Sequence, residues 1–332
     1  MNRHCTEIVE EKEMLKYILN SEKHRFTLCI VGVFLSAVFM LVFLPSFPAA
    51  AEIAQKSFST PDEAVNAFVG AIKKGDTTEL SAILGPGSKD LIFSGDEVSD
   101  RQRGEAFIKA FEQKHELEGE QHGMITLDVG KDNWPFPIPV VHRGNVWLFD
   151  TKAGKEELIN RRIGRNELDA IQVCLGYVDI QREYINTDWD GDGIMAYAQK
   201  IRSDPGRKNG LYWPTIEGEE ESPLGPFVAD AAKEGYVRKG EGQQPYHGYF
   251  FKILKAQGKH APGGAYSYVI NGNMVAGFAL VAWPAKYGVS GVMTFVVNQN
   301  GIVYEKDLRK NTDKIAKTTA KYDPDKTWKR AE

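Results

Sequence analysis

The spacing of apolar residues in the first half of the chain changes from a helical to an extended pattern. Over residues 59–84, apolar side chains recur at steps of three and four, which predicts two helices. A third helix is expected at 103–111. Residues 124–129 and 145–149 have an extended pattern, and a segment spaced by prolines lies between them. Helices followed by a curved antiparallel sheet predict an α+β domain.

The second half repeats the order of helix first and strands afterwards. Residues 156–165 are predicted to be a charged bridge, and Asn166 is a suitable N-cap for a helix that continues to Ile185. Extended segments follow, so a helix packed on an antiparallel meander is expected. The candidate strands are residues 249–254, 266–270, 274–283, 292–297 and 302–304.

A long segment rich in Gly, Pro and acidic residues, 188–244, lies between this helix and these strands, with one short helical stretch at 227–234. Loops of this length are usually functional or disordered. Its aromatic residues favour a loop that is ordered and packed against the domain. They are Trp189, Tyr197, Tyr212, Trp213 and Tyr236.

The N-terminus has the layout of a secretory signal. Basic residues precede an unbroken apolar run at 26–44, and the small residues Ala49-Ala50-Ala51 follow it. Residues 1–51 are therefore predicted to be a signal peptide, and the mature chain is expected in the periplasm or outside the cell. The run is also nearly long enough to span a bilayer, so an inner-membrane anchor with the chain facing the periplasm is the alternative.

The length of the remaining chain suits two ordinary domains. We expect an N-terminal α+β domain at 52–160 and a C-terminal domain at 161–332 that includes the long loop. The formal net charge of −4 is too mild to predict a nucleic-acid partner, and membrane contact is expected only through an uncleaved N-terminal segment. Cys174 is the one cysteine after the predicted signal, which excludes an internal disulfide in the mature chain.

An Asp-rich motif begins the long loop. Asp188, Asp190 and Asp192 alternate with other residues and are followed by a glycine, which matches the first half of a calcium-binding loop. Bound calcium would stabilise the conformation of the long loop. The twelfth position is Gln199, however, where such a loop needs a bidentate glutamate. The alternative is a solvated turn whose aspartates cap a helix at 194–201.

No pattern in the sequence identifies a catalytic site. His247 lies in an aromatic turn and His260 precedes a Gly-rich turn, but neither has the spacing of a metal motif. Cys174 has a semi-apolar helical setting, which is typical of an inert buried thiol. The arginines at 161–165 lie among acidic residues, so they either clamp an anionic ligand or are neutralised in an interdomain interface.

Long ordered blocks extend over nearly all of the chain after residue 51. They are NWPFPIPVV, FDTKAGKEELINRRIGRNEL, Gly210–Pro214, SPLGP, YHGYFFKILKAQG, APGGAYSY and GVMTFVVNQNG. Together these blocks resemble the bacterial family catalogued as domain of unknown function 2950. The resemblance implies kinship, and it supplies neither an activity nor catalytic residues.

Two looser resemblances concern architecture alone. The order of helices and sheet at 52–160 resembles the cone-shaped folds related to nuclear transport factor two. Residues 161–332, with a helix, an Asp-rich loop and a GYFF-containing strand, resemble the globular heads of pilin-like secretion proteins. Pilin heads follow directly on an apolar assembly helix, whereas here a whole domain separates the apolar run from Asn166. The second resemblance therefore implies a head architecture without fibre assembly.

Two exported modules with abundant loop aromatics predict a non-enzymatic binding or scaffold protein of the cell envelope. Its partner is expected to be an envelope protein or a cell-surface ligand. The candidate binding residues are Trp189, Tyr212, Trp213 and His247, because aromatic side chains bury large contact areas at modest entropic cost. Binding is expected to be lost in Trp213→Ala.

The alternative is a periplasmic hydrolase or ligand-processing enzyme that uses the N-terminal cone. Asp128, Asp132 or His142 would then line a pocket. A carboxylate and a histidine facing one cavity would favour this enzyme, whereas an apolar, filled cone would disfavour it.

Overall fold

The computed structural model describes residues 55–331 except residues 122, 190, 216, 217, 219 and 238–242. The predicted signal at 1–51, with its apolar run, and Asp190 therefore lie outside the described residues. Residues 53–332 form one unit of contacts. Within it, the buried apolar side chains gather into one cluster from residues 64–149 and another from residues 170–322.

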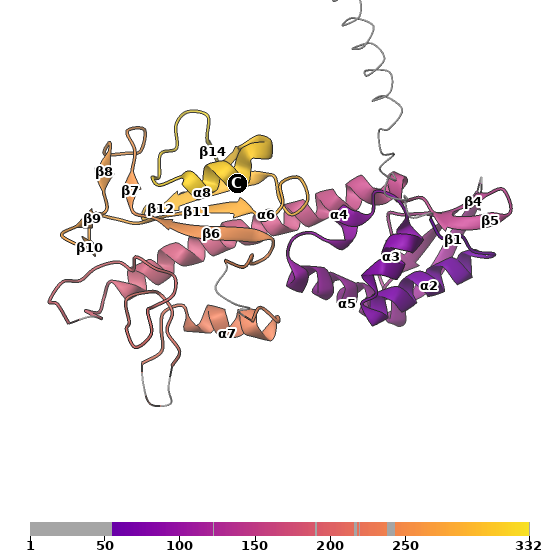
Figure 1. The fold of residues 1–332 in the computed structure, drawn as a ribbon, viewed down its shortest axis with the longest axis horizontal. Helices are drawn as coiled ribbons and strands as arrows, with labels where there is room; N and C mark the ends of the chain where they lie inside the picture. The colour runs from indigo at the N-terminus through magenta and orange to yellow at the C-terminus, as the bar shows by residue number, and fades with distance from the viewer. Residues whose placement is uncertain are drawn as a thin grey trace, which may run out of the picture. The chain divides into compact units, whose positions relative to one another are not determined.

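In the described part of the chain, helices precede the first sheet (Figure 1), and most of them begin at a residue whose side chain caps the helix. They are α2 (Pro61–Lys74), α3 (Thr77–Leu84), α4 (Lys89–Ile92) and α5 (Glu97–Gln113). Thr60 Oγ1 accepts the N–H of Glu63 at 3.1 Å and caps α2, as a residue of this type does at a helix N-terminus. The sequence predicted that the third helix begins at residue 103, whereas α5 begins at Glu97. It begins there because Asp96 caps it, with Asp96 Oδ1 accepting the N–H of Ser99 at 3.0 Å.

The first sheet confirms the predicted antiparallel strands and adds one before them. Its strands are β1 (His115–Gln121), β2 (Met124–Val129), β3 (Trp134–Pro135), β4 (Val140–Arg143) and β5 (Val146–Phe149), in the order β1-β2-β4-β5 with β3 on β2. Aromatic rings fill the space between helices and sheet. The ring of Phe68 lies 5.1 to 5.6 Å, between centroids, from the rings of Phe107, Phe136 and Phe149.

A single helix, α6 (Thr151–Tyr184), corrects the interpretation of residues 156–165 as a bridge. The charged residues there are good helix formers, so the helix runs through them from its N-cap, Asp150. Asn166 does not cap a helix. Its side chain is buried inside α6, where Nδ2 donates to Ser290 O at 2.8 Å.

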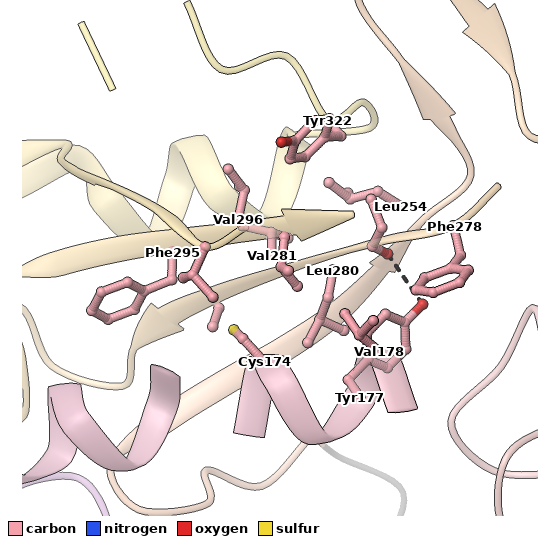
Figure 2. Close-up of a cluster of buried hydrophobic side chains, with 14 of the residues drawn as sticks. Cys174, Tyr177, Val178, Leu254, Phe278, Leu280, Val281, Phe295, Val296 and Tyr322 are labelled. Atoms are coloured by element: carbon pink, nitrogen blue, oxygen red, sulfur yellow. Dashed lines mark hydrogen bonds between the residues drawn. The ribbon is translucent and has the colours of Figure 1, made fainter. Parts of the chain in front are cut away.

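The second sheet is antiparallel and has the order β14-β13-β12-β11-β6. Its strands are β6 (Tyr249–Leu254), β11 (Ala279–Pro284), β12 (Met293–Asn298), β13 (Tyr304–Asp307) and β14 (Lys329–Arg330). All six residues of β11 are buried, because α6 covers one face and α8 (Thr312–Thr318) packs on the other. Cys174 of α6 and Leu280 of β11 belong to the buried cluster between this helix and the sheet (Figure 2), whereas Trp283 Nε1 donates to Asp313 of α8 at 3.2 Å.

Short hairpins flank this sheet where the sequence predicted longer strands. Strand β7 (Ala256–Gln257) pairs with β8 (Tyr266–Ser267), and β9 (Val269–Ile270) pairs with β10 (Asn273–Met274). Asn271 and Gly272 have φ angles of 50° and 92°, which turn the chain between β9 and β10. Helix α7 (Gly225–Lys233) confirms the short helix expected in the long loop, and the 3₁₀ helix η1 (Arg309–Asn311) precedes α8.

Helices combined with antiparallel sheets confirm the α+β class. The predicted domain boundary at 160/161 falls within α6. The cone-like and pilin-like architectures stay predictions. In the described part of the chain, no helix is long and apolar enough to cross a membrane.

Candidate functional site

A pocket of about 220 Å³ lies where the long loop meets the hairpin β9–β10. Its lining comes from Tyr184 at the end of α6, from Thr187, Trp189, Ile194 and residues 196–200, and from Asn209, Lys255, Gly272 and Asn273. The loop is fixed to the hairpin because Tyr197 N donates to Met274 O at 2.8 Å. The sequence indicated an ordered loop here, and the pocket is the hollow that this ordered loop forms.

The Asp-rich turn beside the pocket uses its first carboxylate to hold its own backbone. Asp188 accepts the N–H of Gly191 at 2.9 Å and the N–H of Gly193 at 2.8 Å. Among the residues that the structure describes, no group of three or more His, Cys, Asp or Glu side chains could hold a metal ion. Because Asp190 lies outside those residues, calcium binding stays a prediction.

The second described carboxylate of this turn, Asp192, fastens the loop to β10. Asp192 Oδ2 accepts Asn273 Nδ2 at 2.8 Å. The helix expected at 194–201 is wrong, because this segment has no helical residue and Tyr197 forms an isolated antiparallel bridge with Met274. Asp188 and Asp192 therefore stabilise the turn that follows α6, and neither of them caps a helix.

The tryptophans of the long loop pack against each other. The rings of Trp189 and Trp213 have centroids 4.7 Å apart, and Lys208 Nζ lies 5.4 Å from each centroid. Trp189 lines the pocket, whereas Trp213 is only 4% exposed and belongs to the core. Trp213→Ala would therefore act through stability, and it is unsuitable as a test of binding.

Tyr212 is held by backbone pairing in the same loop, outside the pocket lining. Its N–H donates to Ile201 O at 2.9 Å, and its carbonyl accepts the N–H of Ser203 at 2.9 Å. The guanidinium of Arg202 lies 5.2 Å from the centre of its ring. Tyr212 is half-buried, so part of its surface is open to a partner.

His247 lies in a separate cluster, between α6 and the end of α7. Its Nδ1 is 3.5 Å from Asp169 Oδ2, and its Nε2 is 3.3 Å from Glu234 Oε2. The two carboxylates face different ring nitrogens, so these groups do not converge on one metal ion. This arrangement links the two helices through one imidazole.

The same cluster contains a half-buried tyrosine, Tyr236, in contact with the buried Asp96. The hydroxyl of Tyr236 donates to Asp96 Oδ2 at 2.9 Å and accepts the N–H of His247 at 3.2 Å. Burial, aided by the charge of Asp96, raises the pKa of Tyr236, and burial raises the pKa of Tyr246 to about 12. Both phenols therefore stay protonated at neutral pH, which suits hydrogen bonding rather than proton transfer.

The residues proposed for an enzyme in the first half do not meet in a cavity. His142 N donates to Gly123 O at one end of β2, whereas Asp128 pairs with Pro135 near the other end, about 16 Å along the strand. Asp132 and His142 are exposed, and Asp128 lies on the face of β2 opposite its buried residues. The described side chains of the core between these helices and the sheet are apolar, and their rings pack closely.

Exposed apolar side chains on or next to the pocket lining form what we call the loop–hairpin surface, defined as Ile194, Met195, Ile270 and Val275. Ile194 lines the pocket, and each of the other three lies within two residues of a lining residue along the chain. Met195 and Ile270 are 54% and 50% exposed. Ile270 pairs with Asn273 across the hairpin, so these two side chains share the face that borders the pocket. Single exposed apolar residues are common, but a group of them beside a pocket is typical of an interaction site.

Lys255, Asn273 and Asn209 contribute to the pocket but were not among the candidates from the sequence. They are far apart along the chain, and no local motif connects them. The Asn271-Gly272 dipeptide is a strong hairpin signal, and it could have located the turn beside Asn273. It could not have indicated which loop that turn meets.

We expect Cys174 to resist alkylation until the protein unfolds. Its side chain is buried between α6 and the second sheet (Figure 2), and burial raises the pKa of its thiol to about 12. The reactive thiolate is therefore scarce at neutral pH. Peptide mapping after iodoacetamide treatment should find Cys174 unmodified in buffer and modified in guanidinium chloride. Rapid modification in buffer would contradict this packing.

Comparison with known proteins gives one match. A search of curated proteins and a search of solved structures find no significant match. A family model described as "Protein of unknown function (DUF2950)" matches residues 55–331. The match covers more than half of the chain and includes all the sequence blocks that suggested this family. The chain therefore belongs to the family of domain of unknown function 2950.

Proposed function

We propose that this chain is an exported, non-enzymatic binding protein of the cell envelope, which recognises an envelope protein through the loop–hairpin surface. Export is inferred from the apolar run at 26–44 and the small residues that follow it. The observation that supports binding most directly is the group of exposed apolar side chains on this surface. The apolar side chains packed between the helices and the sheet of the first half favour this proposal over the hydrolase alternative.

Hydrogen bonds join the loop and the hairpin that carry the loop–hairpin surface. The contact of Asp192 with Asn273 and the backbone bond between Tyr197 and Met274 fix the loop against the hairpin. A surface that is already ordered loses little conformational entropy on binding, which favours affinity. Its apolar side chains supply the area to be buried, and polar pocket groups lie beside them.

Introducing charge into this surface should abolish partner capture. The double variant Met195→Asp, Ile270→Asp replaces two exposed apolar side chains. Each substitution removes the roughly 1.5 to 3 kcal/mol of binding free energy that burial of the apolar side chain would contribute in a complex. Crosslinking in intact cells that express the full chain with a C-terminal tag, followed by identification of the captured proteins, measures the effect. We expect capture of a reproducible partner to fall by about tenfold or more.

Leu168→Asp is the matched control, because Leu168 is 62% exposed on α6 and is outside the loop–hairpin surface. It should leave capture unchanged. Equal capture by the double variant and the wild type would refute the proposed location. Repeating the capture after calcium chelation tests the Asp-rich turn, and a loss of the partner would indicate that the turn requires the ion. An empty capture by the wild type would count against the binding function itself.

A further inference from the structure

One lysine in the lining of the pocket, Lys255, forms no ion pair with a carboxylate among the described residues. Lys255 is exposed, and its Nζ donates to the neutral amide oxygen of Gln199 at 3.1 Å. The second lysine of the lining, Lys200, lies 2.5 Å from Asp204 Oδ2, so its charge is offset. An ammonium group has three N–H donors, so Lys255 keeps donors for a ligand. The lining therefore favours an anion.

The amide side chains of the lining also keep hydrogen-bonding capacity. Gln199 Nε2 donates to Gly272 O at 2.6 Å, and Asn273 Nδ2 donates to Asp192 at 2.8 Å. Each of these amides has a second N–H, and each amide oxygen has two lone pairs. The described contacts use only one of the N–H groups on each side chain. Groups that both donate and accept at short range suit a ligand that carries hydroxyl groups.

The aromatic part of the lining and the size of the pocket further limit the chemical class of the ligand. Trp189 and Tyr197 line the same pocket as the amides and lysines. A sugar ring has C–H groups on its faces and hydroxyls at its edges, which matches a wall of aromatic carbon and amides. The volume of about 220 Å³ is below the roughly 300 to 1,000 Å³ of most ligand pockets, which favours a small ligand such as a single sugar ring.

We propose that this pocket binds a carboxylated monosaccharide, with the carboxylate at Lys255, the hydroxyls at Gln199 and Asn273, and the ring near Trp189. This site goes beyond the proposed function, because capture of a protein partner and binding of a small sugar acid can each fail alone. Carboxylated pyranoses occur as free uronic acids and as muramic acid of the bacterial wall. Both sources share the ring, the hydroxyls and the carboxylate that the pocket recognises.

Titrations of the exported, C-terminally tagged protein followed by ligand-observed NMR test this assignment. The probes are D-glucuronate with its neutral counterpart D-glucose, and N-acetylmuramate with its neutral counterpart N-acetylglucosamine. We expect at least one acid to bind saturably and about tenfold more tightly than its counterpart, which corresponds to one charge-assisted contact. The acid that binds more tightly identifies the source of the sugar.

Lys255→Gln should remove the preference for the acid, so that the acid and its neutral counterpart bind within about twofold of each other. Lys255→Arg should retain the preference. The matched control is Lys259→Gln, since Lys259 is also exposed and is outside the pocket lining. Unchanged thermal unfolding of all three variants would show that the substitutions act on binding, as expected for exposed side chains.

Three results would overturn the proposal. The first is the lack of saturable binding by both acids, and the second is equal affinity of each acid and its neutral counterpart. The third is a preference for the acid that survives Lys255→Gln. Loss of the preference in Lys255→Gln, together with its retention in Lys259→Gln, would establish the site.

Discussion

Replacing Gly154 by alanine should lower the free energy of unfolding by about 3 kcal/mol, because the added methyl group has no space. Gly154 is buried in the first turns of α6, where the helix lies against the backbone of residues 137–138. A Cβ placed there meets the carbonyl of Pro137 and lies 2.6 Å from Ile138 N. These are backbone atoms, so they cannot rotate away as a flexible side chain would. Urea unfolding followed by circular dichroism measures the loss.

Gly164→Ala is the matched control, since Gly164 lies in the same helix and a Cβ at this position would meet nothing within 4 Å. Alanine is favoured over glycine inside a helix by roughly 0.5 to 1 kcal/mol, so this variant should be more stable than the wild type. The same substitution is therefore expected to have opposite effects at two positions of α6. Equal stability of the two variants would contradict the close contact of α6 with residues 137–138.

The elements that could be predicted from the sequence are those whose signals are local. Strand β2 has buried residues at every second position, and its bounds at 124–129 agree with the alternating pattern. Helix α2 has a capping threonine, a proline in its first turn and a terminal glycine at Gly75, and all three signals are in the sequence. Residues 249–254 are likewise predicted correctly, as β6.

Helix α6 could not be predicted at its full length because its first half contacts other parts of the chain through polar groups. Asn166 resembles a helix cap in the sequence, since asparagine side chains commonly accept backbone N–H groups. In the fold it donates to Ser290 O, which is 124 positions away along the chain. A hydrogen bond over such a separation leaves no periodic pattern, and the charged residues nearby therefore suggest a bridge between domains.

The candidate pocket could not be predicted in full for the same reason, because its walls come from residues far apart in the sequence. The sequence identifies Trp189 and the Asp-rich turn correctly as parts of an ordered loop, but the opposite wall comes from Lys255 and the hairpin turn. Gln199 is 56 positions from Lys255 and 73 positions from Gly272, and it contacts both. In the sequence, Gln199 is notable only as a position where a calcium ligand is missing. Its contacts assign it a role in the wall of the pocket.

Arg162→Met should lower the free energy of unfolding by roughly 2 to 3 kcal/mol. The sequence leaves open whether the arginines at 161–165 clamp a ligand or are neutralised, and the structure uses Arg162 as a helix cap. Its Nη1 and Nη2 donate to Asp90 O and Leu91 O, each at 2.6 Å. These carbonyls belong to the last turn of α4, where a helix has no backbone donors of its own. Methionine keeps the packing volume but removes both donors.

Arg162→Lys tests whether the planar shape of the guanidinium or its positive charge provides the stability. Burial lowers the pKa of the Arg162 guanidinium to about 10, so the group is still charged at neutral pH. Lysine keeps a positive charge but lacks the planar fork that reaches two carbonyls, so it should recover less than half of the lost stability. Arg165→Met, at an exposed position one turn along α6, should change stability by about 0.5 kcal/mol or less. Urea unfolding could instead show that Arg162→Met is as stable as the wild type. The free-energy cost of burying the charge would then equal the gain from both hydrogen bonds, and the stability of α4 would not depend on this cap.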